Sequence, residues 1–125
     1  MSAFKTCPAC DASWATRDDL IYDPEMHITG YQPATNAEVL GYVLLTHDRP
    51  GCGSTLALDS EDLLDLHDGP VGDGVLYGSD ACRGHCYRVE DITTCDAPCR
   101  NAVIREVIKK IIERRRRLHR ARSAG

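Results

Sequence analysis

The 125-residue sequence has few large apolar side chains: one Phe, one Trp and two Met. Aliphatic residues and five Tyr must therefore form a modest core, and small cores of this kind depend on covalent or metal cross-links. No apolar run is long enough to span a membrane, and the segment from Met1 to Cys7 has no apolar stretch of a secretory signal. These absences predict a single domain in the cytoplasm.

The sequence also lacks the common signatures of catalysis. It contains no phosphate-binding glycine loop, GxSxG elbow, HExxH helix or dinucleotide fingerprint. The acidic residues between Asp59 and Asp68 do not have the spacing of a calcium loop, so their expected role is solubility. The sequence therefore offers no support for an enzyme.

Cysteine, in contrast, is abundant. Six of the seven cysteines form three close pairs and the seventh precedes a glycine: Cys7 and Cys10, Cys82 and Cys86, Cys95 and Cys99, and Cys52. In a reducing compartment such clusters more often hold a metal than form disulfides. We therefore expect metal sites.

The first cysteine set comprises Cys7, Cys10, His47 and Cys52. The CPxC knuckle of Cys7 and Cys10 has the spacing found in structural zinc sites. His47 and Cys52 lie at the two ends of a predicted turn, and a glycine on each side of Cys52 lets the backbone point its thiolate inward. Together they resemble a zinc ribbon in which His-x4-Cys replaces the second CxxC. The alternatives are a non-ligating His47 and a redox CxxC pair, although six residues are too few for the strand that precedes a thioredoxin-like motif.

The second cysteine set is a twin CxxxC pattern that leads into a long predicted helix: Cys82, Cys86, Cys95 and Cys99. Four such thiols could bind zinc, bind an iron–sulfur cluster or close into two disulfides. The pattern resembles the helical hairpins of small mitochondrial intermembrane-space chaperones, which implies disulfides. Zinc is preferred over a cluster because the familiar iron–sulfur patterns use CxxC steps. His85 is a further candidate ligand.

The hydrophobic pattern predicts an α+β fold: a small antiparallel, zinc-ribbon-like sheet, short helices and one long C-terminal amphipathic helix. Strand-forming residues and turn signals place the strands, with an antiparallel hairpin around Thr46–Gly53. A Thr16 cap with Asp19 three residues later predicts a short helix, and Ser60 predicts another. The expected strands are 26–31, 39–45 and 54–58, and the expected short helices are 16–20 and 61–67.

The end of the chain differs from the rest in charge. Residues 1–108 carry 7 basic and 18 acidic groups, whereas residues 109–125 carry 8 basic groups and one acidic group. Apolar residues recur at helical spacing up to Ile112. We therefore predict one metal-stapled domain over residues 1–112 and a basic extension over 113–125. The tail arginines, which could contact an acidic protein surface or phosphates, are Arg114, Arg115, Arg116, Arg117, Arg120 and Arg122.

Several motifs taken in order resemble a group of small bacterial cysteine-rich proteins. They are the CPxC knuckle, Asp23-Pro24 before Ile28-Thr-Gly-Tyr-Gln32, His47 before Cys52-Gly-Ser-Thr-Leu-Ala-Leu58, and the CxxxC pairs before Ala102-Val-Ile-Arg-Glu-Val107. The resemblance implies neither a substrate nor a partner.

The sequence predicts a metal-binding adaptor or regulatory module, with zinc at the first cysteine set and zinc or an iron–sulfur cluster at the second. The alternative function is electron transfer or redox sensing through such a cluster. The expected partner is a protein or a second copy, bound through the C-terminal helix, with nucleic acid as the alternative and no role for a membrane.

Overall fold

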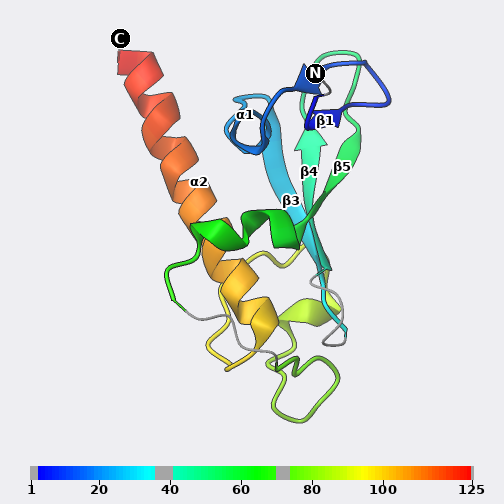
Figure 1. Cartoon of the computed structure of the whole chain (residues 1–125), viewed down its shortest axis with the longest axis vertical. Coiled ribbons are helices and arrows are strands. Elements are labelled where there is room, and N and C mark those ends of the chain that lie inside the picture. The colour runs from blue at the N-terminus through cyan, green and yellow to red at the C-terminus, as the bar shows by residue number, and fades with distance from the viewer. Residues whose placement is uncertain (1–2, 36–40, 70–73, 125) are drawn as a thin grey trace.

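The structure is a computed structural model that describes residues 3–35, 41–69 and 74–124, with only the backbone described for 121–124. As predicted, the fold is α+β: two small antiparallel sheets, short helices and a long C-terminal helix (Figure 1). In these described ranges no helix is both long and apolar enough to cross a membrane.

The elements follow one another along the chain without parallel crossovers. The described helices and strands, in chain order, are β1 (Lys5–Thr6), β2 (Ser13–Trp14), α1 (Arg17–Ile21), β3 (Met26–Pro33), β4 (Gly41–His47), β5 (Thr55–Asp59), the 3-10 helices η1 (Ser60–Leu66) and η2 (His85–Tyr87), and α2 (Arg100–Ala124).

The larger sheet has the order β3-β4-β5, and both pairings are antiparallel. Side chains alternate across it, so Val43 and Leu45 of β4 are buried with Leu56 and Leu58 of β5. The hairpin predicted around residues 46–53 is confirmed. Residues 39 and 40 of the second predicted strand lie outside the described residues.

Strand β3 contains a bulge at Thr29, where the pairing register with β4 shifts between Ile28 and Gly30. The shift lets both Met26 and Tyr31, which are an odd number of residues apart, be buried. A period-two pattern in the sequence cannot anticipate this change of face.

The two short helices begin with side-chain caps. The Thr16 hydroxyl accepts a hydrogen bond from the backbone N–H of Asp19 at 3.1 Å, which confirms the predicted start of α1. At η1 the cap is Asp59, whose carboxylate accepts from Glu61 N–H at 3.0 Å, and the predicted cap Ser60 is instead the first helical residue.

Helix α2 packs against β3 and η1, and its apolar stripe completes the core with Ile104, Ile108 and Ile111. A buried asparagine at its first turn joins the helix to the sheet. Asn101 Oδ1 accepts from Tyr31 O–H at 2.7 Å and from Ala34 N–H at 2.9 Å. Asn101 Nδ2 donates to the Ala34 carbonyl at 2.9 Å.

The two cysteine sets lie at opposite ends of the molecule (Figure 1). The β1–β2 hairpin and the β4–β5 turn meet at one end, beside α1. The long segment from Gly74 to Cys99, which contains η2, forms the other end, below the start of α2. The fold therefore separates the sets in space as well as in sequence.

Candidate metal centre

The first cysteine set forms one compact group. The ligand atoms of Cys7, Cys10, His47 and Cys52 all lie within 4.8 Å of one another. Cys7 Sγ is 3.6 Å from Cys52 Sγ, and Cys10 Sγ is 3.5 Å from His47 Nδ1. A tetrahedral zinc with Zn–S bonds of about 2.3 Å has its sulfurs about 3.8 Å apart. The group could therefore hold a metal ion with little movement.

The first knuckle is the loop of the β1–β2 hairpin, and the two short strands of this hairpin were not among the predicted strands. Strands β1 and β2 pair over two residues each, and the Cys7 N–H donates to the Ala12 carbonyl at 2.7 Å. The Asp11 N–H returns to the Cys7 carbonyl at 2.9 Å, with Asp11 in the left-handed region at φ 62°. Aspartate tolerates this conformation better than most residues, so the loop can close around both thiols.

The second knuckle is the turn between β4 and β5. His47 ends β4, and its carbonyl accepts a hydrogen bond from Gly53 N–H at 3.0 Å. The Cys52 N–H donates to the Arg49 carbonyl at 2.9 Å. Gly51 and Gly53 both have positive φ, 85° and 74°, which is the conformational freedom the sequence suggested for them.

Ser54 is a member of the centre that the sequence analysis missed. Its hydroxyl lies 3.1 Å from Cys7 Sγ and 3.2 Å from Cys52 Sγ, within hydrogen-bond distance of both sulfurs. Hydrogen bonding to Ser54 lowers the pKa of Cys7 to about 5 and also lowers the pKa of Cys52. A lowered pKa favours the thiolate, which is the form that binds metals. A serine two residues after Cys52 gave no signal of this role in the sequence.

His47 is the most buried member after Cys7, with 1% of its surface exposed. Burial by itself lowers the pKa of His47. Its hydrogen bonds with Cys7 and Cys52 together outweigh this effect, so the pKa of His47 lies above its ordinary value. The two thiolates thus favour a positive charge at this point, whether a proton or a metal ion.

Trp14 connects the centre to the rest of the protein. Its indole packs edge-on against the His47 ring at a centroid distance of 5.3 Å, and its Nε1–H donates to the Asp23 carboxylate at 2.8 Å. The Asp23 carbonyl in turn accepts from Arg115 of α2 at 2.9 Å. An aromatic ring, a carboxylate residue and a guanidinium thus link a ligand of the first set to the C-terminal helix.

Replacing Ser54 with alanine is expected to weaken metal binding by roughly ten-fold, because groups that orient metal ligands typically contribute 10–100-fold in affinity. Competition with a chromophoric chelator measures the change. Ser13→Ala, at an exposed serine of β2, is the matched control. Equal affinities of Ser54→Ala and the wild-type chain would show that the hydroxyl does not support the thiolates.

The structure gathers the second cysteine set less tightly. Cys82, Cys86, Cys95 and Cys99 are half-buried and line one cavity, but no three of their sulfurs, with or without a nearby histidine or carboxylate, form a compact group of the first kind among the described residues. Neither CxxxC unit lies on an α-helix: Cys86 is in the 3-10 helix η2, and α2 begins one residue after Cys99.

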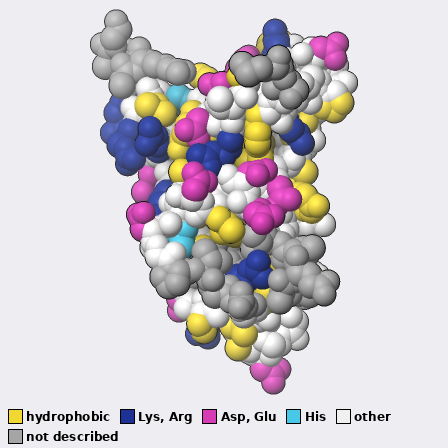
Figure 2. Space-filling view, viewed as in Figure 1, with side chains coloured by type: hydrophobic (Ala, Val, Ile, Leu, Met, Phe, Trp, Pro, Cys, Tyr) yellow, Lys and Arg dark blue, Asp and Glu magenta, His cyan; other side chains and the backbone are white. Residues whose placement is uncertain are grey.

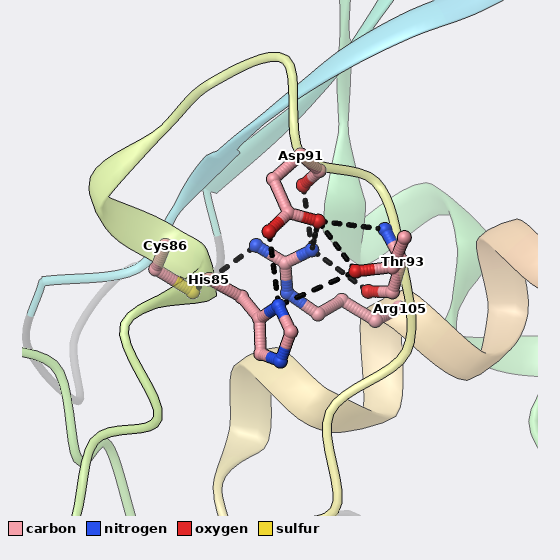
Figure 3. A network of polar contacts seen from close by, with 5 residues as sticks. All are labelled: His85, Cys86, Asp91, Thr93 and Arg105. Carbon is pink, nitrogen blue, oxygen red and sulfur yellow. Dashed lines mark hydrogen bonds and ion pairs between the residues drawn. The ribbon is translucent and has the colours of Figure 1, made fainter.

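His85 also lines this cavity, and a carboxylate holds it (Figure 3). His85 Nδ1 lies 2.9 Å from Asp91 Oδ2 and 3.3 Å from Thr93 Oγ1. Hydrogen bonds with Thr93 and with His85 hold the pKa of Asp91 well below its usual range. An ionised Asp91 fixes the orientation of the imidazole ring.

The tail arginines do not form one continuous exposed surface. Arg115 is 7% exposed, and its guanidinium donates to the carbonyls of Ile21 at 2.7 Å and Asp23 at 2.9 Å. This differs from the expectation of a partner contact, because helix α2 continues past Ile112 and turns Arg115 towards α1. Arg114 stacks over the Tyr22 ring at 5.3 Å. The exposed ones include Arg116, Arg117 and Arg120, whereas the side chain of Arg122 lies outside the described residues.

Comparisons of the chain with models of known protein families, with curated proteins and with solved structures found no match. From its structure, the protein is a cysteine-rich α+β domain with a Cys3His group that could hold a metal ion.

Proposed function

We propose that the protein is a small interaction module stapled by zinc, with the ion at Cys7, Cys10, His47 and Cys52 serving structure. The observation that carries this proposal is the compactness of the group, whose four ligand atoms lie within 4.8 Å of one another although they come from two separate hairpins.

The chemistry of the group favours zinc in a structural role. Three thiolates and one imidazole are a common structural set for zinc, which prefers tetrahedral sulfur and nitrogen ligands. All four coordination positions are supplied by the protein, so none remains for a substrate or a reactive water. Cys7 and His47 are also buried, which places the ion against the core.

Metal analysis of the purified full chain tests the proposal. We expect at least one zinc per chain, and replacement by Co²⁺ should give the visible absorption of a tetrahedral thiolate site. His47→Cys should keep the metal because it retains four suitable ligands, whereas His47→Ala should bind it more weakly. A chain that contains no zinc and whose melting curve is unchanged by chelators would refute the structural site.

A second candidate function, nucleic-acid binding, is favoured by one observation. Exposed Lys and Arg side chains gather on the side of the molecule formed by the C-terminal half of α2 (Figure 2). They include Arg116 and Arg117, which lie beside exposed Arg114 and precede exposed Arg120. Such a positive helical segment suits phosphates.

Reversing these charges is expected to lower affinity for a DNA or RNA probe and to reduce the salt dependence of binding. Each lost phosphate contact should decrease the slope of log K against log salt by about one. Fluorescence anisotropy of Arg116→Glu and of Arg116→Glu/Arg117→Glu measures both effects. Arg88→Glu, at an exposed arginine outside α2, is the matched control. Identical slopes for all variants would remove nucleic acid as a ligand of this helix.

A further inference from the structure

The four cysteines outside the first cysteine set surround one cavity. It lies between the segment containing η2 and the first turn of α2, and Cys82, Cys86, Cys95 and Cys99 all contribute to its lining. None of these four sulfurs is in a disulfide. Two chain segments thus bring two thiols each to the same space, which is how proteins assemble four-thiolate metal centres.

A buried positive charge lies beside these thiols (Figure 3). Arg105 is fully buried, lines the cavity, and donates from Nη2 to Cys86 Sγ at 3.5 Å. Its Nη1 donates to the carbonyls of Asp91 at 2.6 Å and Thr93 at 2.9 Å. These carbonyls fix the guanidinium in place but do not neutralise it.

The charge of Arg105 is only partly compensated by the described residues. The nearest carboxylate oxygen, Asp91 Oδ1, is 3.7 Å away, and the same carboxyl group also binds His85. Arg105 Nε is buried without a hydrogen-bond partner among the described residues. A buried cation without a full counter-charge destabilises the fold, so additional negative charge nearby would be favourable. Four thiolates around a divalent centre carry a net charge of −2 and would supply it.

A second donor is directed at another sulfur. The backbone N–H of Leu76 donates to Cys99 Sγ at 3.3 Å. Cys99 also lies directly before the first residue of α2, where the helix dipole favours a thiolate. Hydrogen bonds of this kind stabilise metal-bound sulfur and tune the properties of the metal.

We propose that this cavity is a second metal centre, in which Cys82, Cys86, Cys95 and Cys99 supply four thiolates and Arg105 balances their charge. The centre is independent of the zinc proposed for the first cysteine set. A single zinc ion would draw the sulfurs to about 3.8 Å from one another. An iron–sulfur cluster, which distributes its ligands over several iron atoms, accepts the wider spacing that the structure has.

The test is metal and sulfide analysis of the full chain purified without oxygen from cells supplied with both zinc and iron. Iron with acid-labile sulfide and visible absorption identifies a cluster, and a second zinc per chain identifies a zinc centre; either supports the proposal. One metal per chain, with the four thiols unbound or disulfide-linked, overturns it.

Two variants, one at each cysteine set, distinguish this site from the first. Cys95→Ser/Cys99→Ser should lose the second metal and keep the first, whereas Cys52→Ser should lose the first and keep the second. Thr94→Ala, at the exposed position directly before Cys95, controls for changes in the loop. A double variant with the metal content of the wild-type chain overturns the proposal. If the double variant does not fold, the metal stoichiometry of the wild-type chain still decides.

Arg105 provides a test of the charge argument. Arg105→Met should weaken metal retention at the second site at least ten-fold, and Arg105→Lys should restore part of it by keeping the charge. Lys109→Met, an exposed cation on the same helix, should change nothing. Equal retention in Arg105→Met and Arg105→Lys would show that the guanidinium contributes by packing and not by its charge.

Discussion

Cys7→Ser is expected to lose one metal per chain and to lower the melting temperature by 10 °C or more. The free energy of binding a structural zinc is folding free energy, on the order of 10 kcal/mol in small zinc domains at neutral pH. A loss of only about 3 kcal/mol already shifts the melting temperature by roughly 10 °C in a chain of this size. Cys7 is fully buried in the main core cluster, so the serine also places a polar hydroxyl group in the core.

Metal content by mass spectrometry and thermal melting by circular dichroism measure the two effects together. Ala9→Ser introduces a serine at an exposed position of the same knuckle and should leave both quantities unchanged. If Cys7→Ser keeps the metal of the wild-type chain, then the first cysteine set is not the zinc site.

The second large effect is expected at Asn101. Its amide makes three buried hydrogen bonds, one with the Tyr31 hydroxyl and two with the backbone of Ala34. Asn101→Leu keeps a side chain of similar length but leaves these partners buried, and each costs about 1–3 kcal/mol without a hydrogen bond. We expect a total loss of about 3–5 kcal/mol in the free energy of unfolding, among the largest for a single substitution.

Urea denaturation at equilibrium, with metal content held constant, measures this loss. Tyr31→Phe removes a single hydrogen bond of the group and should cost about 1 kcal/mol. The double variant should cost less than the sum of the two single variants because both act on the same bond. Strict additivity would indicate that the bond between Tyr31 and Asn101 does not contribute to stability.

The sequence predicted the class of fold because its strongest signals are local. Thr16 as a helix cap, the β-branched strands and the isoleucine stripe of α2 all depend on residues a few positions apart. The bulge at Thr29 and the buried Arg115 were not predictable, because both depend on partners far away in the chain. In the sequence, Arg115 is one of several consecutive arginines and is expected to be solvated. In the structure, its guanidinium contacts the end of α1.

The candidate site was likewise predicted only in the parts that have a sequence motif. Paired cysteines and a histidine before a glycine-flanked cysteine pointed to the first cysteine set, and the structure brings its members together. Ser54 and Arg105 were missed because neither belongs to a ligand motif. The Ser54 hydroxyl lies within hydrogen-bond distance of Cys7 Sγ, and Arg105 donates to Cys86 Sγ. The identity of the metal at either cysteine set remains a prediction for the experiments above.

The contacts from His47 through Trp14 and Asp23 to Arg115 have a consequence for regulation. An ion that fixes His47 would also restrain Trp14 and Asp23, and the Asp23 carbonyl anchors Arg115 of α2. Two binding events that stabilise the same contacts share a coupling free energy, and this coupling is reciprocal. We therefore expect a ligand of the arginine segment to tighten metal binding by the same factor by which the metal tightens that ligand.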